Sequence, residues 1–173
     1  MENKIKITFI SDTHNKHKQA DSLLTNGDIL IHSGDMTSMG YTEEIINFCI
    51  WFNKLDNYKN KLFISGNHDF IFEKEPIKAK EIYSLFDNIK YLQDECIYIE
   101  NEKLNRPIKI YGSPWQPLFY NWAFNLTEEE LAKKWEKIPE DVDILITHGP
   151  AYGYLDRVIG KYENLGSKTL IKQ

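Results

Sequence analysis

Residues able to bind a divalent metal ion follow four apolar segments of this chain. The set comprises Asp12, His14, Asp35, Asn67, His68 and His148. Carboxylates, an amide oxygen and neutral imidazoles together suit Mn, Fe or Zn better than calcium, which prefers oxygen ligands alone. The set therefore predicts a site for a divalent transition-metal ion.

The spacing of these residues favours a shared site. Asp12 and His14 are two positions apart, so in an extended chain their side chains point the same way and can reach one ion. A glycine precedes both Asp35 and Asn67. Glycine permits tight turns and close approach of backbone segments, and such turns can aim several side chains at one point.

Each piece alone has an ordinary structural explanation. The Asp-x-His pair could be a turn with a surface histidine, and Asp35 could be a helix cap. The segment 67–69 could be a polar turn, and His148 a satisfied histidine at the end of a strand. Their occurrence in order, after four separate apolar segments, favours a metal site over coincidence.

The apolar segments that position these residues are predicted to be β-strands, at 5–10, 29–32, 62–64 and 142–147. Strand ends on one side of an α/β sheet meet at the same edge, where such sheets bind ligands. The sequence therefore predicts that the metal-binding residues converge at a sheet edge.

The remaining pattern predicts further strands and helices. Helices are expected at 42–55, 76–86 and 127–135, and strands at 89–92, 96–99 and 108–111. The last two strands are expected to pair as a hairpin around 101–106. Strands alternate with helices at first and dominate the middle, which predicts an α/β fold with mixed sheets. The 173 residues fit a single domain.

Composition narrows the classes of protein that remain. Hydrophobic residues make up 42% of the chain, so we expect an ordered domain. The net charge is −5, whereas a nucleic-acid-binding protein needs a basic surface, so we expect no nucleic-acid partner. Cys49 and Cys96 form no CxxC pair, which predicts reduced thiols. The N-terminal segment does not resemble a signal peptide and no stretch is long enough to span a membrane, so we expect a cytoplasmic protein without membrane contact.

Four short motifs together resemble the calcineurin-like metallophosphoesterase superfamily. They are Ser-Asp-Thr-His at 11–14, Gly-Asp at 34–35, Gly-Asn-His-Asp at 66–69 and Thr-His-Gly-Pro at 147–150. The match covers nearly the whole chain in the expected order, and the third motif is the most specific. Segments 112–117 and 122–125 resemble the metallophosphoesterase-domain-containing branch, of the cyclic-nucleotide phosphodiesterase class.

The resemblance implies a role for each matching metal ligand. Asp12 and His14 would hold a first divalent ion, Asn67 and His148 a second, and Asp35 would bridge the two. It also implies a sandwich of two mixed β-sheets flanked by helices, with the site at strand ends along one edge. The reaction it implies is phosphodiester hydrolysis by a hydroxide that two ions, Mn, Fe or Zn, activate.

The resemblance further implies catalytic and substrate-binding residues. His68 would face the substrate and assist the leaving oxygen, and Asp69 would orient His68. Asn67, His68 and Trp115 are the expected substrate contacts, with Trp115 lying in an aromatic segment that otherwise suits core packing. His17 is expected to be a solvated loop histidine, and His32 a packing residue at the end of a strand.

The chain departs from the family pattern at its end. Members of the family complete the two metal sites with a Gly-His-x-His motif, and residues 1–173 contain no such motif. The last residues, 166–173, resemble the helix that precedes the strand carrying it. We therefore expect one domain that lacks this last strand, with reduced metal occupancy and low activity.

Two classes of function remain open at this point. The first is a metallophosphoesterase that acts on a small phosphate ester or nucleotide. Such an enzyme could be a homo-oligomer. The second is a catalytically weakened or inactive binding module, or a truncated fragment, in keeping with the missing motif. The intact ligand set at Asp12, Asp35 and His148 favours the enzyme.

Overall fold

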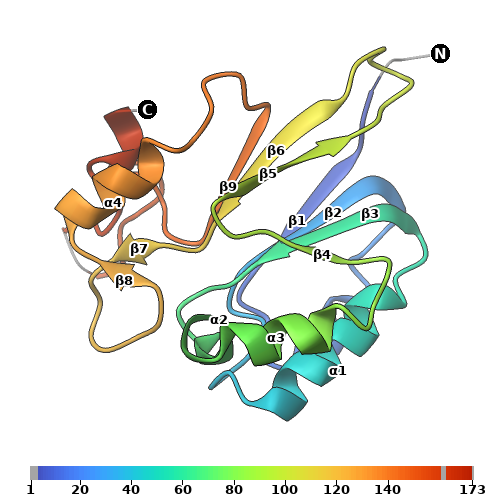
Figure 1. Cartoon of the computed structure of the whole chain (residues 1–173), viewed down its shortest axis with the longest axis horizontal. Helices are drawn as coiled ribbons and strands as arrows, with labels where there is room; N and C mark the ends of the chain where they lie inside the picture. The colour runs from blue at the N-terminus through green and yellow to red at the C-terminus, as the bar shows by residue number, and fades with distance from the viewer. Residues whose placement is uncertain (1–3, 161–162, 173) are drawn as a thin grey trace.

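Two β-sheets pack against each other at the centre of the protein, in a computed structural model that describes residues 4–160 and 163–172. The first sheet has the strand order β1-β2-β3-β4 and is parallel throughout. Its strands are β1 (Ile7–Ile10), β2 (Gly27–Ser33), β3 (Tyr58–Ile64) and the short β4 (Lys90–Tyr91). The two sheets diverge from a common edge, as Figure 1 shows.

The second sheet has the order β5-β6-β9 and is mixed. It contains β5 (Glu95–Ile99), β6 (Ile108–Ser113) and β9 (Ile144–Thr147). β5 and β6 form an antiparallel pair, whereas β9 runs parallel to β6. Aliphatic side chains from both sheets fill the space between them, among them Ile31, Leu62 and Ile110.

Three helices cover the outer face of the first sheet. They are α1 (Thr42–Asn53), α2 (Phe70–Lys74) and α3 (Pro76–Tyr83). Adjacent side chains on a strand point to opposite faces, so Leu30 packs under the helices while Ile29 and Ile31 face the second sheet. Burial on both faces explains why residues 29–31 of β2 are consecutive apolar residues.

A smaller unit extends from the second sheet. β7 (Gln116–Pro117) and β8 (Asn125–Leu126) pair with each other, and α4 (Glu128–Trp135) follows. Thr127 begins α4 with a capping box: its hydroxyl accepts a hydrogen bond from the Glu130 N–H, and the Glu130 side chain accepts one from the Thr127 N–H. Leu131 and Trp135 of α4 pack on Leu170, at the start of the 3₁₀ helix η2 (Leu170–Lys172).

The predicted sandwich of sheets flanked by helices is confirmed, and so is each helix and strand expected from periodicity, within a few residues at its ends. Only the second sheet is mixed. The prediction missed α2 and the β7–β8 pair, whose strands are two residues long. In the final segment the described residues form the turn of η2 and two isolated bridges, Ala151 with Ser167 and Arg157 with Asn164, and Gln173 lies outside the described residues.

Both cysteines are free, with Cys49 buried and Cys96 partly buried. Among residues 4–160 and 163–172, no helix is long and apolar enough to cross a membrane.

Candidate metal centre

The loops that follow β1, β2 and β3 meet at one edge of the first sheet, and backbone hydrogen bonds join them. The N–H of Asp12 donates to the Gly34 carbonyl and the N–H of His14 donates to the Asp35 carbonyl, both at 3.0 Å. The N–H of His68 donates to the Asp35 carboxylate at 2.8 Å. His148, at the end of β9, joins them from the second sheet. The predicted convergence at this edge is therefore what the structure shows.

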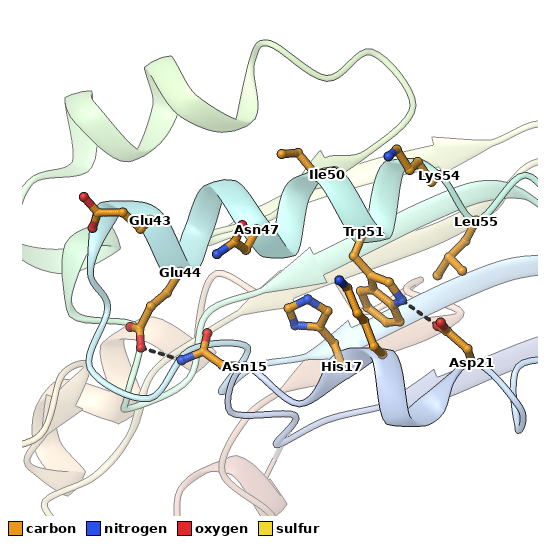
Figure 2. A pocket seen from close by; sticks show the side chains of 11 residues that line it. Asn15, His17, Asp21, Glu43, Glu44, Asn47, Ile50, Trp51, Lys54 and Leu55 are labelled. Atoms are coloured by element: carbon orange, nitrogen blue, oxygen red, sulfur yellow. Dashed lines mark hydrogen bonds between the residues drawn. The ribbon is translucent and has the colours of Figure 1, made fainter.

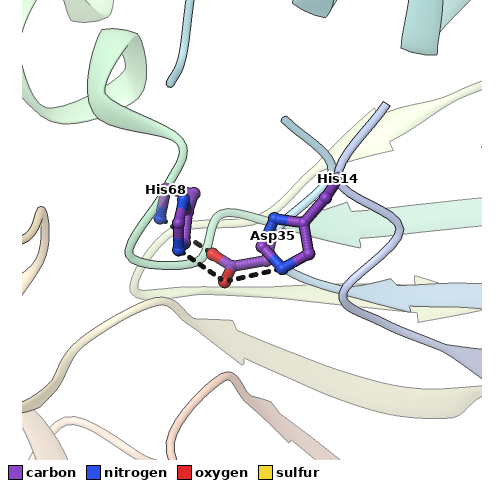
Figure 3. Close-up of side chains that lie close together, drawn as sticks. All are labelled: His14, Asp35 and His68. Atoms are coloured by element: carbon purple, nitrogen blue, oxygen red, sulfur yellow. Dashed lines mark hydrogen bonds and ion pairs between the residues drawn. The ribbon is translucent and has the colours of Figure 1, made fainter. Parts of the chain in front are cut away.

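Three imidazole rings direct their Nε2 atoms at the carboxylate of Asp35. Those of His14 and His68 lie 3.7 and 3.9 Å from Oδ2, and that of His148 lies 3.5 Å from Oδ1. Figure 3 shows His14 and His68 approaching Asp35 from different directions. The Asp35 side chain is only 4% exposed, so the rings surround a nearly buried carboxylate.

The other ring nitrogen of each histidine is held by a backbone carbonyl oxygen. Nδ1 of His14 bonds to Thr37, that of His68 to Ser38 and that of His148 to Ser33, at 3.0, 2.7 and 2.9 Å. A carbonyl oxygen can only accept a hydrogen bond, so Nδ1 carries the proton. In the neutral ring Nε2 then has a free lone pair, which is the arrangement found in metal-binding histidines.

Two groups of side chains among the described residues could each hold a metal ion. One consists of His14, Asp35 and His68, and the other of Asp12, Asp35 and His148; within each group the ligand atoms lie within 4.8 Å of one another. Asn67 extends the second group, because its Oδ1 lies 3.1 Å from Nε2 of His148. The chemistry of this donor set fits divalent transition metals, and Asp35 belongs to both groups.

This grouping differs in part from the one that the resemblance implied. Asp35 is shared and Asn67 lies with His148, as expected. His14, however, is grouped with His68 rather than with Asp12, so His68 lies close enough to act as a ligand as well as to face a substrate.

Three of the candidate ligands have a strained backbone. Asp12, His14 and Asp35 have φ angles of 55°, 40° and 56°, in the left-handed region that residues other than glycine seldom adopt. Such a conformation persists only when surrounding contacts stabilise it, and it is concentrated at functional sites. Here it turns all three side chains toward the same edge.

Gly66 is required by close packing. A Cβ atom at this position would collide with Oδ1 of Asp35 and with the Asp35 backbone nitrogen. A Cβ at Gly34, which has a φ of 100°, would lie 2.7 Å from the Gly66 nitrogen and 2.7 Å from Nδ1 of His148. The glycines that the sequence places before Asp35 and Asn67 therefore allow two loops to touch.

Asp69 stabilises the loops of the centre and does not contact the ring nitrogens of His68. Its buried carboxylate accepts hydrogen bonds from the N–H groups of Asp35, Thr37 and Gly66, at 2.9, 3.0 and 2.7 Å, and from the Thr37 hydroxyl. The expectation that Asp69 orients His68 directly needs correction, because Nδ1 of His68 bonds to the Ser38 carbonyl. These donors could not be read from the sequence, since all except Gly66 come from residues 35–37, which lie 32–34 positions before Asp69.

The centre also changes the pKa values of its members. Burial opposes charge on His148, yet its contact with the Asp35 carboxylate raises the pKa of His148 to about 9. Burial likewise opposes charge on Asp35, but His148 and the His68 N–H lower its pKa overall. Burial and the neighbouring Asp35 raise the pKa of Asp69 to about 6, against its hydrogen bonds. Asp35 is thus kept as an anion, the form that binds a cation.

Trp122, and not the expected Trp115, lies beside His68. The indole N–H of Trp115 donates to Asp94, and Lys134 lies 3.9 Å from its ring centre, so Trp115 anchors the small unit. The prediction that Trp115 contacts substrate finds no support in these contacts. Trp122 instead packs against His68, with ring centres 4.0 Å apart.

His17 also differs from expectation. It is buried, at 3% exposure, and its ring packs 4.8 Å from that of Trp51, so the prediction of a solvated histidine was wrong. Both line a cavity of about 670 Å³ between α1 and the 3₁₀ helix η1 (His17–Ala20), shown in Figure 2. His32 is fully buried and bonds to Thr13, as a packing residue should. Neither histidine belongs to the candidate centre.

Residues 5–169 match the model of the calcineurin-like phosphoesterase family. The chain belongs to this family. Metallophosphoesterase domain-containing protein 1 of Homo sapiens is 39% identical over 181 residues, covering 96% of this chain and 55% of that protein. A UPF0046 protein of Caenorhabditis elegans is 34% identical over 167 residues, covering 90% of this chain and 57% of that protein. The phosphoesterase chain thus spans little more than half the length of these relatives.

Solved structures support the same fold. A crystal structure of a Thermus thermophilus protein superposes with a TM-score of 0.66 at 10% identity, covering 98% of this chain and 76% of that one. The family and the branch expected from the motifs are both confirmed, and family membership supports hydrolase chemistry with bound metal.

Proposed function

We propose that this phosphoesterase hydrolyses phosphodiesters at a centre of two divalent ions that share Asp35. The observation that carries the proposal is the convergence of three imidazole Nε2 atoms on this one carboxylate, each ring fixed through Nδ1 by a backbone carbonyl. Imidazole Nε2 atoms that are aimed and immobilised in advance have a metal-binding geometry rather than a packing role.

Each residue of the centre has a distinct role in this proposal. Asp35 would be shared by the two ions, with His14 and His68 beside one of them and Asp12, Asn67 and His148 beside the other. When bound, Mn, Fe or Zn supplies a hydroxide near neutral pH and offsets charge on the phosphoryl oxygens. Asp69 maintains the spacing of the loops through its hydrogen bonds to Asp35 and Gly66.

His68 transfers the proton to the leaving oxygen in this proposal. Its Nδ1–H is committed to Ser38, so proton exchange takes place at Nε2, which faces the centre. The side chain is 24% exposed, which leaves Nε2 accessible to a substrate. An imidazole protonates near neutral pH and is suited to general acid catalysis there.

The test combines metal content with hydrolysis of bis(p-nitrophenyl) phosphate, with and without added Mn²⁺. We expect metal-dependent turnover that Asp35→Ala abolishes together with metal binding. Asp143→Ala is the matched control, because Asp143 is an aspartate paired with Arg106 far from the centre in the fold. A folded wild-type protein with neither metal nor turnover would favour a binding module instead.

The role of His68 is tested by His68→Ala. If His68 is the general acid, its removal should lower turnover by about 100-fold or more, while metal content stays near the wild-type value. Equal loss of metal and turnover would instead make His68 a ligand, as its place beside His14 also allows.

A further inference from the structure

The loop between β7 and β8 places aromatic side chains beside the candidate centre. The ring of Trp122 lies 4.0 Å from the ring of His68, centre to centre, with an angle of 38° between the planes. His14 contacts His68 with its edge, at 4.6 Å. Trp122 is therefore next to the proposed proton donor without offering a metal ligand.

An uncharged recess adjoins Trp122. It has a volume of about 490 Å³ and is lined by Met39, Phe70, Tyr120, Asn121 and Trp122. Met39 is 47% exposed and Tyr120 is 82% exposed, which is unusual for large apolar or aromatic side chains that gather at one place. None of the five lining residues carries a charge, although the neighbouring centre is rich in charged groups.

The loop is held in place independently of any ligand. The N–H of Ala123 donates to the carbonyl of Asn67 at 3.1 Å, and the N–H of Phe124 donates to Glu73 of α2 at 2.8 Å. The side-chain amide of Asn125 donates to the carbonyls of Phe119 and Tyr120, at 2.9 and 3.1 Å. A surface fixed in this way loses little conformational entropy when it binds a ligand.

We propose that this recess binds a flat aromatic group on the leaving alcohol of the phosphate ester, and that Trp122 is the residue on which the group stacks. The proposal rests on the proposed function, because it takes His68 to face the leaving oxygen. An alcohol departing at His68 would leave beside the Trp122 ring, whose centre lies 4.0 Å from that of His68. Aromatic faces attract each other beyond the apolar area they bury, so a planar group is preferred to a saturated group of equal size.

A different role for the same contact must be separated from this one. Trp122 could serve only to fix the ring of His68, in which case its loss would slow the hydrolysis of aromatic and saturated esters equally. Substrate selection, by contrast, changes the ratio between the two classes of ester.

The experiment measures binding of phenylphosphonate and cyclohexylphosphonate, which have the same charge and ring size but differ in planarity. Tryptophan fluorescence or calorimetry follows binding in the metal-free protein and again with Mn²⁺. We expect the wild-type protein to bind the phenyl compound about 10-fold more tightly. Trp122→Leu should remove the preference and Trp122→Phe should retain most of it. Leu118→Ala, an exposed residue of the same loop outside this recess, should leave it unchanged.

Equal affinity for the two compounds in the wild-type protein, or an unchanged preference in Trp122→Leu, would overturn the proposal. Failure of the proposed function would be recognised separately, because metal-dependent hydrolysis would then be absent. Because binding is compared with and without Mn²⁺, the preference for an aromatic group is decided whether or not the protein turns over substrate.

Discussion

The polar loops of the metal centre are those that follow β1, β2 and β3, and the aromatic loop beside them joins β7 to β8. The two kinds of loop achieve rigidity by different means. In the polar loops, the backbone of Asp35 and Gly66 is bonded to a buried carboxylate, and three of the ligands take left-handed conformations. In the aromatic loop, residues 118–120 have exposed side chains, and the Asn125 amide donates hydrogen bonds to the carbonyls of Phe119 and Tyr120.

The difference teaches where each kind of substitution is tolerated. A loop that is close-packed on its own backbone has no room for an added atom, so small changes there displace every ligand at once. A loop whose backbone is hydrogen-bonded while its side chains are exposed can change one of those side chains without moving the residues beneath it. Mutations in the two loops should therefore separate loss of activity from change of specificity.

Among substitutions that leave every candidate ligand side chain in place, the largest effect is expected for Gly66→Ala. The added methyl group collides with the backbone and carboxylate of Asp35, so the bridging ligand must move. We expect turnover of bis(p-nitrophenyl) phosphate to fall by about 100-fold, because displacement by an ångström at a catalytic centre has this order of cost. Gly149→Ala is the control: its Cβ meets the Gln116 side chain at 3.1 Å rather than backbone, and it should lose far less activity.

Asp69→Asn should mainly lower stability. The amide nitrogen replaces an oxygen that accepts backbone N–H groups, leaving buried donors unpaired. We expect the free energy of unfolding to fall by about 2–3 kcal/mol, measured by urea denaturation of the metal-free protein. A variant as stable as wild type would show that these hydrogen bonds do not hold the polar loops together.

Trp115→Phe should have an intermediate effect on stability and none on specificity. It removes the hydrogen bonds to Asp94 but preserves an aromatic ring against Phe124. We expect a loss of about 1 kcal/mol in the free energy of unfolding. The preference for phenylphosphonate should match wild type, in contrast to Trp122→Leu, and a lost preference would reinstate Trp115 as a substrate contact.

The smallest effect is expected for Asp143→Asn, in neither loop. The hydrogen bond from Arg106 lowers the pKa of Asp143 to about 2, below its ordinary value of 3.8. A carboxyl group whose pKa is lowered by folding stabilises the protein above its unfolded pKa, and this contribution disappears as pH falls through the folded value. Wild type should therefore exceed the variant slightly in thermal midpoint at neutral pH, and the two should converge as pH approaches 2. Added salt should reduce the difference, since the pair is exposed.

The sequence predicted strands and helices well where the hydrophobic pattern extended over enough residues to be recognised. The helix expected at 42–55 is α1, and the strand expected at 29–32 lies within β2. The five-residue α2 and the two-residue β7 and β8 escaped prediction, because so few residues carry no periodic signal and their conformation depends on distant contacts. His17 was misjudged for the same reason: its neighbours in sequence are polar, whereas its neighbour in space is Trp51.

By itself, the sequence determined which residues are candidates for the chemistry, since ligand type, glycine spacing and position after a strand are local properties. It could not assign partners across the chain. Only the tertiary structure decided that His68 is oriented by Ser38 rather than Asp69, and that Trp122 rather than Trp115 lies against it. The physical reason is that a hydrogen bond or ring contact depends on the separation of atoms in space, and folding brings together residues that are far apart along the chain.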